Sequence, residues 1–337
     1  GTTSSAASDV YKRQSPRRKH PRRPTPSNRL PCSSKPGGCT SRCIPFLLLL
    51  PSEGYLIGKL RFLHIPKTAG TTFDECLFLQ YLGPYLLRRQ FVFSGDIAAD
   101  RRRFAGLSQA ARDRIQVCTG HAPRVTGCRE IDAMPVVTLL RHPVERVKSL
   151  CRHISEGKSP HIYSPREHGS FDLDGLLSSG RIQLSNFQSR MLLGEEDYRL
   201  PPGNTTELAN RASALLISEF SCFGMTEELD RSLLMFSQVL GWDGWPLYRS
   251  RNSSNPQAAL QFEARHIDRI EELNRLDLAV YEEARKAFFL RWQSCGPELE
   301  EALPRFRLAL ARPHLRFAAI DLARGAGKLG RLVLPSR

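Results

Sequence analysis

A short loop in the first quarter of the chain carries the side chains best suited to binding an anion. Lys67 supplies a positive charge, and hydroxyl groups follow at Thr68, Thr71 and Thr72. Gly70 lets the backbone approach a ligand closely, and the N–H groups at the start of a helix attract negative charge. This combination indicates a site for a phosphate or for a group of similar shape and charge.

The loop needs a strand before it and a helix after it. Lys59 to Ile65 form a largely apolar run of strand length, and Pro66 ends it because proline has no N–H group for the ladder. Residues 72–81 then predict a helix. The Walker A loop, GxxxxGK[ST], uses the same physics, but here the lysine precedes the glycine and no GK[ST] occurs. An ordinary strand-to-helix turn is the alternative for this loop taken alone.

A second strand-to-helix junction lies in VVTLLRHPVERVKSL, residues 136–150. Residues 136–140 predict a buried parallel strand, and Pro143 suits the first turn of a helix. Arg141 lies at the junction, and Ser149 follows about two turns into that helix. An arginine fork beside a hydroxyl can hold a doubly charged phosphate. The alternative is a solvated arginine and a serine on a helix face.

An imidazole is predicted at the end of a third strand. Residues 115–121, IQVCTGH, alternate as a short strand does and end in Gly120 and His121. In an open α/β sheet, ligands bind beyond the carboxyl ends of the strands, so His121 is a candidate general base. A lone histidine is more often structural.

Together, PKTAGTT (66–72) and LRHPVERVKS (140–149) resemble the paired 5′-phosphosulfate and 3′-phosphate motifs of carbohydrate sulfotransferases. These enzymes use 3′-phosphoadenosine 5′-phosphosulfate (PAPS), and the likeness is greatest to the heparan sulfate and uronosyl 2-O-sulfotransferase branch. PKTGTT is the typical form, so Ala69 is an extra residue. The resemblance covers residues 61–292. It implies an α/β, P-loop-like three-layer fold with a central parallel sheet flanked by helices.

The resemblance also implies a reaction, in which a sulfuryl group moves from PAPS to a hydroxyl of a glycosaminoglycan-like carbohydrate without a metal. Lys67 would neutralise charge on the leaving phosphate oxygen. Thr119-Gly120-His121 resembles the HGH signature of that branch, whose second histidine is the base, so this role carries over to His121. Some relatives use a carboxylate on the helix after the loop, which makes Asp74 and Glu75 rival bases. The cofactor-binding residues implied are Lys67, Thr68, Ala69, Gly70, Thr71, Thr72, Arg141, Ser149, Arg249 and Arg251.

The last two of these arginines rest on position alone. Arg249 and Arg251 occupy the place where relatives have a basic segment over the adenine and the 3′-phosphate, and a solvated turn is the alternative. Three more segments resemble the family without a role attached. They are NFQSR (186–190), FGMTE (223–227) and LDLAVYEEARKAF (276–288).

Charge and composition bound the domain organisation of the 337 residues. The net charge is +15, but residues 1–43 and 304–337 hold most of the excess, which leaves the middle of the chain close to neutral. We therefore expect no nucleic-acid partner. Residues 1–51 predict a disordered basic region, truncated or artefactual at its start, and 52–303 the sulfotransferase domain. Residues 304–337 form a basic tail that could mediate homo-oligomerisation.

The family resemblance implies a Golgi enzyme with a type II membrane anchor. The apolar run IPFLLLL (44–50) is shorter than a membrane span, so the anchor is not present as written. Asn204 and Asn252 begin N-glycosylation sequons, which matter only in that compartment. A P-loop kinase or NTPase and a noncatalytic basic binding protein are the alternative functions. The missing GK[ST], and Arg141 in place of a metal-binding aspartate, count against the kinase.

Overall fold

The computed structural model describes residues 58–159, 162, 171–194, 198–249, 260–312 and 317. The chain divides into two compact units, Gly1–Gly54 and Tyr55–Arg337, and the described residues all lie in the second unit.

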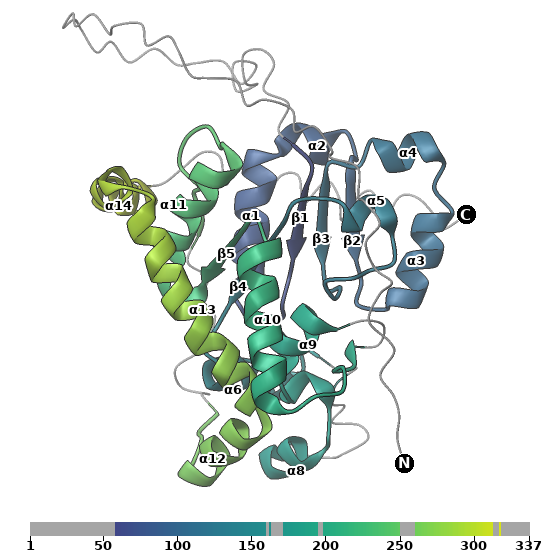
Figure 1. Cartoon of the computed structure of the whole chain (residues 1–337), viewed down its shortest axis with the longest axis vertical. Helices are drawn as coiled ribbons and strands as arrows, with labels where there is room; N and C mark the ends of the chain where they lie inside the picture. Colours follow the sequence, from purple (N-terminus) through teal and green to yellow (C-terminus); the bar gives the residue numbers. More distant parts are fainter. Residues whose placement is uncertain are drawn as a thin grey trace, which may run out of the picture. The chain divides into compact units, whose positions relative to one another are not determined.

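A five-stranded parallel sheet forms the centre of this unit (Figure 1). The strand order is β2-β3-β1-β4-β5, and every neighbouring pair is parallel. Strands buried on both faces are typical of parallel sheets, and β1, β3 and β5 are buried along their whole length. The bounds are β1 (Leu60–Leu63), β2 (Gln90–Phe93), β3 (Val117–Gly120), β4 (Val136–Leu140) and β5 (Cys222–Met225).

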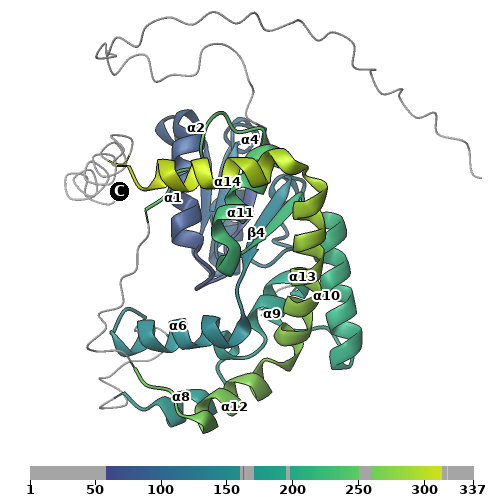
Figure 2. The same ribbon diagram turned by 90° about the vertical axis from the view of Figure 1, so that its left-hand side faces the viewer.

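Helices cover both faces of the sheet, so the predicted α/β fold with three layers is confirmed. Figure 2 shows α1 and α11 on one face and α10 and α13 on the other. Rings of Phe73 and Phe236 lie 4.8 Å apart between α1 and α11. The helices are α1 (Gly70–Gln80), α2 (Leu82–Leu86), α3 (Ile97–Ala105), α4 (Gln109–Asp113), α5 (Arg129–Asp132), α6 (Pro143–Ser155), α8 (Leu173–Ser178), α9 (Phe187–Leu193), α10 (Thr205–Glu219), α11 (Leu229–Leu240), α12 (Ala264–Leu273), α13 (Arg275–Ser294) and α14 (Pro297–Leu310).

A second, smaller hydrophobic core lies beyond the carboxyl ends of the strands. Side chains of α6, α8 and α12 form it, among them Val147, Leu150, Leu176 and Ile270. The main core fills the space between the sheet and its helices. Figure 2 shows α6, α8 and α12 together, set apart from the sheet. Since β4 runs directly into α6, the Arg141 junction lies between the two cores.

Elements that the sequence did not reveal lie between the predicted ones. The arginine-rich stretch after α2 contains β2, α3 and α4. Helices α12 and α13 meet at Asn274. Helix α14 continues through Pro304, where the basic tail was expected to begin, and buries Phe306. In the ranges that the structure describes, no helix combines the length and hydropathy needed to cross a membrane.

Candidate active site

The loop between β1 and α1 is held in an uncommon backbone conformation. Lys67 has φ 72° and Ala69 has φ 62°, both in the left-handed region that residues with a Cβ rarely adopt. Ala69 is the N-cap of α1, and its carbonyl accepts hydrogen bonds from the N–H groups of Thr72 and Phe73. Because two of the three residues 67–69 have this strained backbone, contacts with the rest of the protein must hold the loop in place, as is common at ligand sites.

The two small residues of the loop have roles within the protein. The Thr68 side chain is buried, and its hydroxyl donates to the carbonyl of Ile65 at 2.8 Å, which closes the loop. A Cβ on Gly70 would lie 1.9 Å from Nε2 of His64. Glycine at 70 therefore makes room for an imidazole, a reason that the sequence did not reveal. Thr71 is exposed and Thr72 is half-buried in the first turn of α1.

Arg141 reaches the backbone of Lys67 at this loop. The Nη1 atom of Arg141 donates to the Lys67 carbonyl at 3.2 Å. Burial lowers the pKa of Lys67, and the charge of Arg141 lowers it further. Burial likewise lowers the pKa of Arg141. Two partly desolvated cations side by side make the site favourable for an anion. Ser149 is half-buried on α6, the helix that follows Arg141.

His121 follows β3 directly and is held by backbone carbonyls. Its Nδ1 lies 2.9 Å from the carbonyl oxygen of His64, and because a carbonyl can only accept, Nδ1–H donates. The lone pair of the neutral ring is then on Nε2, the form that a general base requires. Gly120 has φ 107°, and a Cβ there would lie 2.2 Å from the Phe93 carbonyl oxygen. Glycine thus allows the chain to turn into His121.

His64 is a site residue that the sequence analysis missed. Its ring centroid lies 4.6 Å from that of His121, and its Nδ1 lies 3.4 Å from Oδ2 of Asp74. The hydroxyl of Thr119 donates to the other oxygen of Asp74 at 2.8 Å. The signal available was position, because His64 follows β1 directly, just as His121 follows β3.

The rival base Glu75 and the candidate Arg249 are bound to each other. Glu75 is fully buried, and its Oε1 lies 3.3 Å from Nη2 of Arg249. Arg249 also lies over the ring of Phe317, with 5.1 Å from its guanidinium carbon to the ring centroid. In this arrangement Arg249 faces a carboxylate of α1. Arg251 lies outside the described residues.

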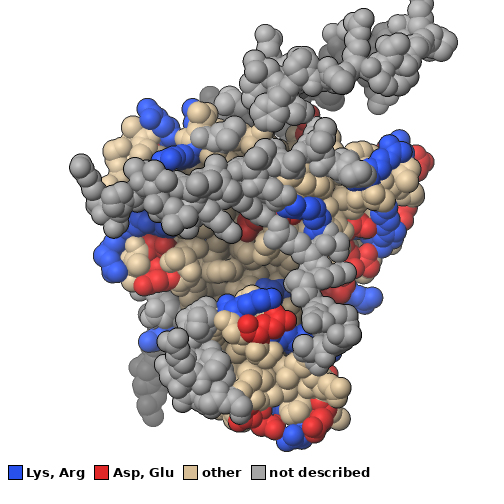
Figure 3. Space-filling view, turned by 180° about the vertical axis from the view of Figure 1, so that it is seen from behind, with Lys and Arg blue, Asp and Glu red and all other residues tan. Residues whose placement is uncertain are grey.

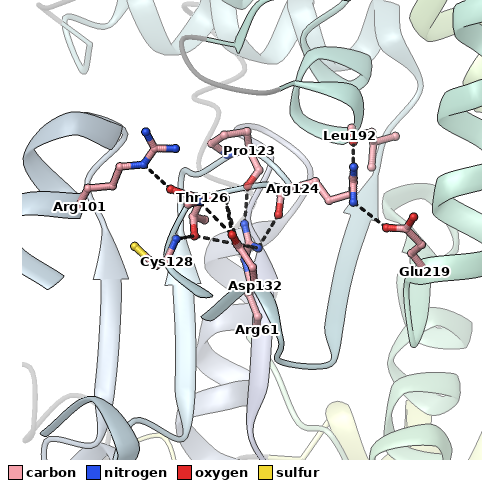
Figure 4. Close-up of polar contacts among 10 residues, drawn as sticks. Arg61, Arg101, Pro123, Arg124, Thr126, Cys128, Asp132, Leu192 and Glu219 are labelled. Atoms are coloured by element: carbon pink, nitrogen blue, oxygen red, sulfur yellow. Dashed lines mark hydrogen bonds and ion pairs between the residues drawn. The ribbon is translucent and has the colours of Figure 1, made fainter. Parts of the chain in front are cut away.

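A buried arginine fixes the loop that follows His121 (Figure 4). Arg61 of β1 is 3% exposed and donates to the carbonyls of Pro123 and Arg124, the latter at 2.6 Å. It also pairs with Asp132 at 3.1 Å, whose carboxylate accepts from the N–H and hydroxyl groups of Thr126. These bonds tie the loop that follows His121 to β1.

Comparison with known proteins finds a sulfotransferase that is similar to this chain. No protein-family model matches the chain. Over 313 residues the chain is 25% identical to heparan-sulfate 6-O-sulfotransferase 1-B of Danio rerio, an alignment that covers 82% of this chain and 75% of the relative. This similarity supports a relationship to carbohydrate sulfotransferases. It does not confirm the 2-O branch, because the relative is named as a 6-O enzyme. Across the ranges described, no group of His, Cys, Asp or Glu side chains could hold a metal ion.

Proposed function

We propose that this protein is a carbohydrate sulfotransferase, which moves a sulfuryl group from PAPS to a hydroxyl of a glycosaminoglycan-like acceptor. The observation that carries the proposal is the meeting of Lys67 and Arg141 at one strand-end loop, with His121 on the next strand. The similarity to a heparan-sulfate sulfotransferase over 82% of the chain supports it.

The residues present fit a donor that carries phosphate groups at two places. Lys67 and the N–H groups at the start of α1 would bind the 5′-phosphosulfate, and Thr71 and Thr72 would add hydroxyls. Arg141 and Ser149 would bind the 3′-phosphate. Burial has already lowered the pKa of both cations, so the negative charge of the donor would relieve an unfavourable arrangement. Arg249 would contribute only after leaving Glu75.

His121 and Lys67 would then perform the chemistry. Nε2 of His121 accepts the proton of the acceptor hydroxyl as its oxygen forms a bond to sulfur. The bond between sulfur and the bridging phosphate oxygen breaks, and Lys67 stabilises the charge that develops on that oxygen. In sulfuryl transfer as in phosphoryl transfer, the reacting groups must lie in line, so positioning contributes much of the rate.

Activity measurements on labelled PAPS test this proposal. The wild type is incubated with a panel of desulfated glycosaminoglycans, and disaccharide analysis of the products distinguishes 2-O from 6-O transfer. We expect Lys67→Ala and His121→Ala each to lose at least about two orders of magnitude in kcat, the usual scale for such groups. Near-normal turnover by His121→Ala would move the base to another residue, with Asp74 the first candidate.

Calorimetry separates the proposal from a P-loop kinase. We expect tight binding of adenosine 3′,5′-bisphosphate, the product of the donor, and weaker binding of ATP with magnesium. A preference for ATP would overturn the sulfotransferase assignment.

A further inference from the structure

The backbone of Arg141 is bound on both sides by one amide side chain. Oε1 of Gln188 accepts from the N–H of Arg141 at 3.0 Å, and Nε2 of Gln188 donates to the carbonyl of the same residue at 2.8 Å. Gln188 is 2% exposed. The two bonds fix which end of the amide is which, because a backbone N–H only donates and a carbonyl only accepts.

The peptide groups on either side of Arg141 are held in a similar way. The N–H of His142 donates to Glu227 at 2.8 Å, and the Thr226 hydroxyl donates to the carbonyl of Leu140 at 2.9 Å. Glu227 itself accepts from the hydroxyl of Tyr281 at 3.1 Å. Between the end of β4 and the start of α6 the backbone needs partners outside regular structure, and these side chains supply them.

Gln188 is in turn fixed by a buried carboxylate. Asp277 accepts from the N–H groups of Gln188 and Ser189 at 3.0 and 2.7 Å and from the Ser189 hydroxyl at 2.5 Å. In return, Oδ1 of Asn186 accepts from the N–H groups of Leu276 and Asp277 at 3.0 and 3.2 Å. The N-termini of α9 and α13 therefore cap each other, which gives Gln188 a rigid base.

We infer that Gln188 is a positioning residue, which sets the direction of the Arg141 guanidinium for binding the 3′-phosphate of the donor. The inference rests on the proposed function. Arg141 has a long side chain, so a small rotation of its backbone moves the guanidinium far from Lys67. A glutamate at 188 would keep the size and the acceptor but would turn an oxygen toward the Arg141 carbonyl, where no hydrogen bond can form.

The test compares two nucleotides by calorimetry, adenosine 3′,5′-bisphosphate and adenosine 5′-phosphate, so that their Kd ratio isolates the 3′-phosphate. We expect the wild type to prefer the bisphosphate. Gln188→Glu should lose about tenfold or more of that preference, the scale of a buried hydrogen bond replaced by an unpaired acceptor. Its affinity for adenosine 5′-phosphate should change little.

Ser189→Ala is the matched control. It removes a buried hydrogen bond to Asp277 in the same turn of α9 without touching Arg141. We expect it to lower Tm and to keep the preference for the bisphosphate. In an Arg141→Ala background, Gln188→Glu should change the preference no further, because the effect acts through Arg141.

The outcomes distinguish the inference from the proposed function. A wild type without preference for the bisphosphate would overturn the donor site itself. A wild type with the preference and a Gln188→Glu variant that keeps it would overturn only the role of Gln188. If Ser189→Ala lost the same preference for the bisphosphate, the effect would come from the stability of α9, and the positioning role of Gln188 would be overturned. Should Gln188→Glu fail to fold, Gln188→Met, of similar length and without polar groups, takes its place in the same comparison.

Discussion

His64 and His121 follow neighbouring strands and lie with their rings 4.6 Å apart, beside the loop that carries Lys67. The carboxylate of Asp74 contacts His64 and Thr119, so it is bound within the site. Of the groups near His121, the carbonyl of His64 directs its Nδ1 proton. At the scale of single residues, these contacts make His64 and Gly70, which leaves room for its ring, the residues to test.

Gly70→Ala should destabilise the protein because the new Cβ would overlap the ring of His64. Overpacking of this kind costs about 1–3 kcal/mol of the free energy of unfolding, measurable by urea denaturation. Gly83→Ala is the control, since a Cβ there meets no atom within 4 Å. Combining Gly70→Ala with His64→Ala should restore most of the loss, and a double variant no more stable than Gly70→Ala would contradict this reason for the glycine.

Lys67 predicts a pH dependence of nucleotide binding. Burial and Arg141 lower the pKa of Lys67, so the free protein loses this proton at a lower pH than an ordinary lysine does. Binding an anion then requires reprotonation, and the affinity for adenosine 3′,5′-bisphosphate should fall as the pH rises through the lowered pKa. Calorimetry across the alkaline range measures it. Lys67→Arg, which stays charged, should flatten the profile, and an unchanged slope would exclude Lys67 as its origin.

At the scale of elements, the junctions after β1, β3 and β4 were predictable from the sequence. β4 and the start of α6 occur where the apolar run and Pro143 indicated them. β2 was missed because it has only four residues in an arginine-rich stretch and alternates between buried Phe91 and Phe93 and exposed Val92. β5 was missed because Gly224 lowers strand propensity. Its glycine is required, since a Cβ there would lie 2.5 Å from that of Ser232.

Some contacts of the site could be predicted from the sequence and others could not, for a physical reason. Arg141 and His121 follow strands directly and Lys67 lies in the loop after β1, so their positions could be inferred from the sheet. The contacts of Gln188 and Glu227 with the Arg141 junction depend on how helices pack, which no local pattern encodes. The segments NFQSR and FGMTE could be matched to a family but not given a task, and the structure gives them one.

We expect the loop after His121 to depend for its stability on the ion pair between Arg61 and Asp132. Asp132→Asn keeps the size of the side chain but weakens its bonds to Arg61 and to the loop N–H groups. We expect the free energy of unfolding to fall by about 1–3 kcal/mol, as for other buried polar groups left poorly paired. Glu283→Gln is the control, because its pair with Lys286 is exposed and should contribute nothing measurable. Equal stability of both variants would contradict a structural role for Arg61.

At the scale of the whole molecule, the described surface mixes charges of both signs. On the face seen in Figure 3, basic and acidic side chains lie near one another rather than in one basic patch. Arg101 and Arg103 contact the Thr126 carbonyl and Asp100. An anionic acceptor of the proposed enzyme would meet charges of both signs on this face.

The mutual capping of α9 and α13 has a consequence for the order in which the protein folds. Asn186 and Asp277 are about ninety residues apart in sequence, so the two caps close only when α13 has been made and has docked. Before that moment Gln188 lacks the bonds to Asp277 that fix it. The strands pair over similarly long separations, as β4 does with β5, but all five precede α13 in the chain, whereas the proposed 3′-phosphate half of the site also needs α13. During synthesis on the ribosome, nucleotide binding would therefore be acquired only after the chain has grown past α13.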